Sequence, residues 1–178
     1  MQPHLLYDYL CTARARLFDW IRPLSKEQYE REFPYGLKTI HATLLHTAGA
    51  EWLYGKRVQG QPATIADVPF RPEKITTFAV VEAEWEKLAK ETRTWLEAIK
   101  DWDTQIEWRA RVPSQAEGAP MIRFRTTKGG VASQLLFHEV HHRSQVMSML
   151  RQLGVAAQNL DYSVLKFDRQ EERTEVKA

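Results

Sequence analysis

The sequence predicts an all-α fold, a four-helix bundle in which a long crossover joins the third helix to the fourth. Two observations lead to it. Four long segments repeat apolar residues at spacings of three and four, the period of one helical face. The segment before the last of them loses that period. We expect one domain over residues 1–167, which includes a short packed segment at 161–167, and a charged, frayed tail at 168–178.

The first three helices are expected at about residues 5–21, 37–58 and 76–100. The first ends before Pro23, because proline disfavours the helical conformation for the residue that precedes it. The third has the clearest apolar face, with Glu and Lys filling its outer side. That face consists of Phe78, Val81, Trp85, Leu88, Thr92, Trp95 and Ile99.

In the crossover, the spacing of apolar residues changes from the helical period to alternation. Apolar and polar residues alternate over 106–112 and 121–125, which predicts either a short β-hairpin with a long loop at 113–120 or an extended crossover. The fourth helix is expected from Gly129 to Leu153. It is apolar on two sides, so it is either central in its domain or lies at a subunit interface. Its second apolar stripe consists of Leu136, Val140, Met147 and Leu150.

Composition limits the function. The net charge of +2 is too small to suggest nucleic-acid binding, which usually needs a cluster of basic residues. The single cysteine, Cys11, excludes an internal disulfide and suits a reducing cytosol; we expect a buried, inert thiol. No apolar run reaches the roughly 20 residues that span a bilayer, and the N-terminus lacks the features of a signal peptide. We therefore expect a cytoplasmic protein with neither a nucleic-acid nor a membrane partner.

Two histidines of the fourth helix indicate a metal site. His138 and His142 are four residues apart, so they lie on one face of the helix, and that face is apolar. An imidazole buried without a partner is costly, whereas one divalent ion satisfies two of them. His46 is the best third ligand, because it lies mid-helix in an apolar setting beside the small residues Gly49 and Ala50. The alternative is that each histidine packs in the core or is solvated.

Other polar residues near this pair are candidates for catalysis. His141 could replace either ligand, or it could form a hydrogen bond to one of them without binding the metal itself. It could also lie at the mouth of a pocket or be a surface histidine. Arg143 could pair with a substrate carboxylate or form a structural ion pair. Gln145 could orient a bound species or a ligand ring. Glu51 and Glu139 are candidate acid/base groups or supports for the ligands.

Two segments carry a family resemblance. Residues 39–53 resemble the second-helix signature of the DinB-like (DinB/YfiT) superfamily, and residues 138–145 resemble its fourth-helix signature. The pair at 161–162 resembles the segment that follows in the family. The similarity covers about residues 5–167 in the same order and spacing. It departs at Ser144, where the family usually has glycine between the arginine and the glutamine.

The resemblance implies a four-helix bundle that binds a divalent metal, commonly zinc or nickel, through His46, His138 and His142. Some relatives are thiol-dependent S-transferases or isomerases that use low-molecular-weight thiols, and many are dimers. It therefore implies a metal-dependent transferase that moves such a thiol onto a small electrophile, or a hydrolase, with an open coordination position and a homodimeric state. Three neutral histidines leave the full charge of the ion to activate a water or a thiol.

Two alternatives to an enzyme stay open. The first is a non-catalytic metal-binding or stress-response protein, in which a fourth protein ligand would close the site. The second is a scaffold dimer with purely structural histidines, which would retain no metal.

Overall fold

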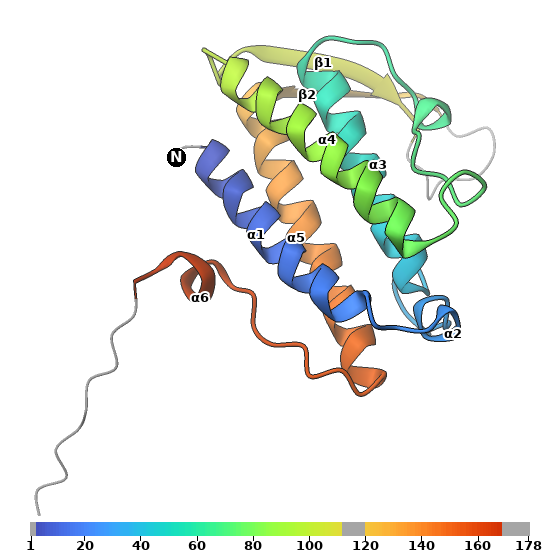
Figure 1. Cartoon of the computed structure of the whole chain (residues 1–178). Coiled ribbons are helices and arrows are strands. Elements are labelled where there is room, and N and C mark those ends of the chain that lie inside the picture. The colour runs from blue at the N-terminus through green and yellow to red at the C-terminus, as the bar shows by residue number, and fades with distance from the viewer. Residues whose placement is uncertain (1–2, 112–119, 169–178) are drawn as a thin grey trace, which may run out of the picture.

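The computed structural model describes residues 3–111 and 120–168. Four long helices lie side by side, and a two-stranded hairpin crosses the end of the bundle where α3 and α4 end and α5 begins (Figure 1). The predicted all-α bundle with a short hairpin is thus confirmed. The elements are α1 (Pro3–Ile21), α2 (Lys26–Tyr29), α3 (Ile40–Val58), η1 (Ile65–Asp67), α4 (Phe78–Ala98), β1 (Gln105–Ala110), β2 (Ile122–Thr127), α5 (Lys128–Gln152) and α6 (Tyr162–Lys166).

Capping threonines set where three of the long helices begin. The side chain of Thr39 accepts a hydrogen bond from the backbone N–H of Ala42 at 2.9 Å, so α3 begins after Thr39 and not at residue 37. Thr77 caps α4 in the same way. Thr127 ends β2 and also caps α5, accepting from the N–H of Gly130 at 3.0 Å. The strand therefore leads directly into the helix that carries His138 and His142.

The crossover is a hairpin and not merely an extended chain. β1 and β2 pair antiparallel, with Gln105 opposite Thr127 and Ala110 opposite Ile122. Trp108 and Phe124 stack on one face, with ring centroids 5.3 Å apart and an interplanar angle of 6°. That face packs towards α3 and α5, which supply the support that an isolated hairpin lacks. Most of the loop expected at 113–120 lies outside the described residues.

The helix α5 packs against α1 and α3. Its second apolar stripe is divided. Met147 and Leu150 are buried, whereas Val140 is 37% exposed, and its neighbour Phe137 is 66% exposed. The C-terminal half of the stripe thus belongs to the core. The homodimer stays a prediction, since a single chain is described.

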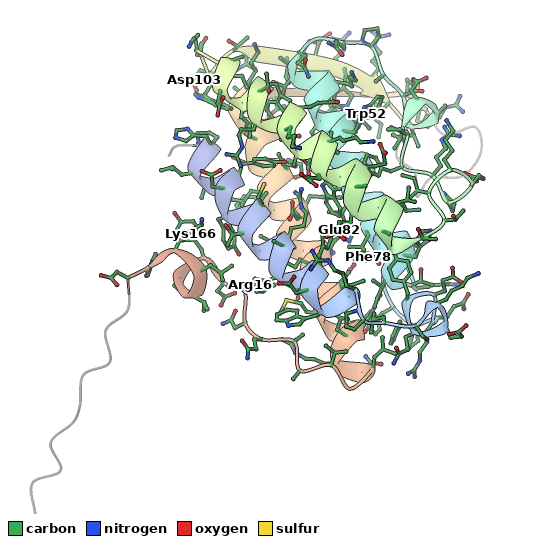
Figure 2. The ribbon with its side chains drawn as sticks, viewed as in Figure 1. Arg16, Trp52, Phe78, Glu82, Asp103 and Lys166 are labelled. Atoms are coloured by element: carbon green, nitrogen blue, oxygen red, sulfur yellow. The ribbon has the colours of Figure 1, made fainter. Side chains whose placement is uncertain are left out.

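The segment after α5 packs along α1, as expected for residues 161–167. The Tyr9 hydroxyl donates to the Leu160 carbonyl at 2.9 Å, and the Tyr9 and Tyr162 rings meet edge to face at 5.1 Å. Lys166 of α6 lies beside α1 (Figure 2), where its Nζ donates to Oγ1 of Thr12 at 3.1 Å.

Within the described part of the chain, we find no helix with the length and apolar character needed to cross a bilayer.

Candidate metal centre

Three histidines from two helices converge on one point. His46 comes from α3, and His138 and His142 come from successive turns of α5. The Nε2 atoms of His46 and His138 are 3.1 Å apart, and one ring nitrogen of each of the three residues lies within 4.8 Å of the others. Their ring centroids are separated by 4.5 to 5.0 Å. The structure thus brings together the three residues that the sequence singled out.

The geometry fits a divalent ion. Imidazole nitrogens bind zinc at about 2.0–2.1 Å, so two ligands that subtend roughly 90–110° at the ion lie about 2.9–3.4 Å apart. The 3.1 Å between Nε2 of His46 and Nε2 of His138 falls in this range. Within the part of the chain that is described, the group contains three ligands and no fourth. Such a donor set leaves a coordination position open.

All three imidazoles are held in the form that binds metals. Burial lowers the pKa of His46, His138 and His142, and their mutual repulsion as cations adds to the effect at His46 and His138. The pKa of His138 falls to about 3. The three side chains are therefore neutral at pH 7, and a metal need not displace a proton from them.

Gln145 fixes the orientation of His142. Its Oε1 lies 2.9 Å from Nδ1 of His142, and its Nε2 lies 3.1 Å from Nε2 of His141. An amide oxygen can only accept, so Nδ1 of His142 carries the proton and its Nε2 keeps a free lone pair for a metal. His141 lies on the exposed side of α5 and anchors the amide. The candidates Gln145 and His141 thus form a chain of hydrogen bonds behind the ligand.

A glycine that the sequence did not single out lets the chain close over this amide. Gly36, in the connection between α2 and α3, has a φ of +57°, a conformation that favours glycine. A Cβ there would lie 3.1 Å from Oε1 of Gln145. Ser144, where the sequence departs from the resembled signature, is exposed.

The two glutamates that were candidate acid/base groups belong to a separate interior cluster. Nη2 of Arg14 on α1 lies 2.8 Å from Oε2 of Glu51 and 2.5 Å from Oε2 of Glu139. The Tyr7 hydroxyl and Nε1 of Trp85 also donate to Glu51, at 2.5 and 2.8 Å. We call these five residues the Arg14 cluster. Its centre was missed, although Arg14 is a charged residue on the apolar face of its helix.

Arg143 is also an interior residue. Its side chain is buried, its Nη2 donates to the Tyr9 hydroxyl, and its guanidinium lies 5.0 Å from the centroid of the Tyr9 ring. No carboxylate of the described residues lies within salt-bridge distance of Arg143, and its Nη1 has no hydrogen-bond partner among them. The structural ion pair that the sequence suggested is thus replaced by a contact with a tyrosine.

His46 and His138 open onto a cavity of about 890 Å³. Its walls are α3, the connection that contains η1, and the hairpin. The His46 side chain is exposed at this cavity and does not lie in the closed core, and the cavity wall around it is largely apolar. The space beside Gly49 is also largely occupied: a Cβ on Gly49 would lie 2.7 Å from Cγ1 of Val68. Gly49 therefore lets the connection approach α3 and form the cavity wall.

These features define the class of the protein: a helical bundle with a three-histidine candidate metal centre that opens onto a large cavity. The chain matches the DinB family over residues 1–174 and belongs to that family. The resemblance seen in the two helix signatures is thus confirmed. A comparison with curated proteins found none that matches the chain.

Proposed function

We propose that this protein is a divalent-metal-dependent transferase that activates a low-molecular-weight thiol and delivers it to a small electrophile. The observation that carries the proposal is the convergence of His46, His138 and His142 at the wall of a cavity of about 890 Å³. Membership of the DinB family supports it, because the resemblance implies both the metal and the thiol. Imidazole nitrogens are ligands for both zinc and nickel.

The residues of the chain supply the holding and positioning. His46, His138 and His142 would bind the ion in their neutral form, and Gln145 keeps Nε2 of His142 directed at it. A divalent ion bound there would supply a strong positive charge that deprotonates a thiol at neutral pH. The cavity at His46 and His138 gives a second reactant access to that point.

The resemblance to thiol-dependent relatives favours a thiol over water as the nucleophile. Hydrolysis commonly uses a carboxylate base beside the ion. Glu51 and Glu139 are buried against Arg14, so neither faces the cavity, and the carboxylate among its lining residues is Glu73, on the connection before α4. A thiol would have to come from outside the chain. The one cysteine, Cys11, is half-buried away from the histidines' cavity, and burial raises the pKa of its thiol.

The proposal is tested first by elemental analysis of untagged protein, before and after incubation with zinc and with nickel. We expect about one ion per chain in the wild type and none in a variant with alanine at His46, His138 and His142. The matched control is His41→Ala, which changes a histidine of the same helix whose Nδ1 lies 3.1 Å from the Tyr29 hydroxyl. Absence of metal in the wild type would overturn the proposal.

A second assay separates the enzyme from a metal-binding protein without turnover. Loaded protein is mixed with a small thiol and 1-chloro-2,4-dinitrobenzene, and conjugation is followed by absorbance. We expect a rate above that of the triple-alanine variant. Stoichiometric metal without any rate enhancement over a panel of thiols and electrophiles would favour the non-catalytic alternative.

A further inference from the structure

The cavity at the histidines has a second polar end. His46, Tyr54 and Arg57 all line it from α3. The α-carbons of His46 and Arg57 are eleven residues apart, about 16 Å along the axis at 1.5 Å per residue. Side chains on a helix lean towards its N-terminus, so the guanidinium of Arg57 leans back towards His46. The cavity therefore has the candidate metal centre near one end and a cation near the other.

Arg57 is held by aromatic rings and not by a carboxylate. Its Cζ lies 4.6 Å from the ring centroid of Trp108 and 5.8 Å from that of Tyr54. Over residues 3–111 and 120–168, its guanidinium has no salt bridge and no hydrogen bond to the protein. Burial lowers the pKa of Arg57, because no neighbouring anion compensates the lost hydration. The N–H donors of the Arg57 guanidinium are therefore held in place by the aromatic rings but have no hydrogen-bond acceptor among the described residues.

A second arginine at the cavity shows the contrast. Nε of Arg71 donates to the Val68 carbonyl at 3.0 Å, and its Nη2 donates to the Ala66 carbonyl. These bonds tie the connection between α3 and α4 into the cavity wall. Arg71 therefore has a structural use that accounts for its presence, whereas Arg57 has none of this kind.

The space between the two ends is apolar and aromatic. Trp108 and Phe124 present a stacked pair on the hairpin side, and Tyr54 lies edge-on to His138 with ring centroids 5.8 Å apart. A volume of about 890 Å³ lies within the usual range for small-molecule sites, about 300–1,000 Å³. The lining is otherwise largely apolar, and its charged residues are three arginines, Arg57, Arg71 and Arg111, and one carboxylate, Glu73. The excess of positive charge makes the pocket complementary to an amphiphilic anion.

We propose that this cavity binds a substrate with a carboxylate at Arg57, an aromatic or aliphatic body along Tyr54 and Trp108, and its reacting end at the histidines. The planar guanidinium can donate two parallel hydrogen bonds to a carboxylate. The distance between the ends requires an extended body of several carbon–carbon bonds and not a two-carbon acid. The identity of the reacting end rests on the proposed function; the anion site does not.

The test is a calorimetric titration of metal-free protein at pH 7.5 with 4-phenylbutyrate and with its neutral analogue 4-phenylbutanamide. We expect the acid to bind at least about tenfold more tightly than the amide, since a hydrogen bond to a charged group is stronger than one to a neutral group. Arg57→Gln should remove that preference and leave the amide affinity unchanged. Arg109→Gln, on the exposed face of the same strand as Trp108, is the matched control and should bind both probes as the wild type does.

The two proposals fail separately. Wild-type protein that holds no metal but prefers the acid would overturn the transferase and support the anion site. Equal binding of acid and amide by the wild type, or a preference that survives Arg57→Gln, would overturn the anion site whatever the metal content. The triple-alanine variant should retain the preference for the acid, because Arg57 and Trp108 are unchanged in it.

Discussion

The same helices carry two polar clusters of opposite design. In the Arg14 cluster, one guanidinium lies between two carboxylates, and a tyrosine and a tryptophan donate further hydrogen bonds. Burial disfavours the charged guanidinium, but Glu139 and Glu51 outweigh it and raise the pKa of Arg14. In the histidine group, three like side chains bring one ring nitrogen each to within 4.8 Å of the others. The first cluster is complete without a ligand, whereas a divalent cation would complete the second.

The helices α3 and α5 carry the structural cluster and the candidate metal ligands on different faces. On α3, Glu51 follows His46 by five residues, about 140° around the helix axis. On α5, Glu139 directly follows His138, about 100° around its axis. Arg14 therefore ties the two ligand-bearing helices together on the side that faces α1. A small cavity of about 10 Å³, lined by Arg14, Glu139 and His142 among others, lies where the two groups meet. We infer that the Arg14 cluster supports the spacing of the histidines.

The largest effect should follow from removing the centre of the complete cluster. Arg14→Met leaves two carboxylates buried without a counter-ion, and breaking a buried pair in this way costs about 3–5 kcal/mol. We expect a loss of that size in the free energy of unfolding, measured by guanidinium denaturation of metal-free protein. Metal content should fall as well, since α3 and α5 lose their common anchor.

The control for this change is an exposed arginine. Arg22→Gln removes contacts with Glu82 and Asp19 at the surface, where solvent screens such pairs, so its unfolding midpoint should stay close to that of the wild type. If Arg14→Met were as stable as Arg22→Gln, the Arg14 cluster would not be the support that we infer.

A smaller effect is expected at the histidine group. Gln145→Leu removes the acceptor that holds the proton on Nδ1 of His142. Loss of such a partner typically weakens metal binding 10–100-fold. A competitive titration with a chromophoric chelator would measure the change. Unfolding of the metal-free protein should be little affected.

Gln152→Leu is the matched control, because this residue ends the same helix and its amide donates to the Tyr35 hydroxyl at 3.0 Å. Wild-type metal affinity in Gln145→Leu would show that His142 needs no such support. A loss of equal size in both variants would indicate a general effect on α5.

Short-range patterns in the sequence account for most of the fold. Helical spacing predicted the four long helices to within a few residues. Two of them begin two or three residues later than predicted, because Thr39 and Thr77 cap their N-termini. The sequence could not decide between a hairpin and an extended crossover. A hairpin is stable here because it packs against α3 and α5, and these packing contacts are not visible in the local sequence pattern.

For the candidate site, spacing alone could pair His138 with His142, since both lie on one helix. His46 was added as the best placed histidine of another helix, and the family resemblance supported it. Contacts between segments that are distant in the sequence could not be predicted. Nothing in the local pattern links Arg14 to Glu51 and Glu139, or Arg57 to the strand residue Trp108, because tertiary packing alone brings them together.

The smallest predicted effect is a pH dependence of stability at His138. In the unfolded chain, His138 binds a proton near pH 6.5, whereas burial and its neighbours lower the pKa to about 3 in the folded protein. Between these values the unfolded state holds the extra proton, so acidification favours unfolding. Metal-free wild type should lose about 1 kcal/mol of unfolding free energy from pH 7.5 to 5.5 through this residue. Urea denaturation at both pH values would show a shallower loss in His138→Ala, and equal slopes in the two proteins would mean that His138 is not held neutral by its surroundings.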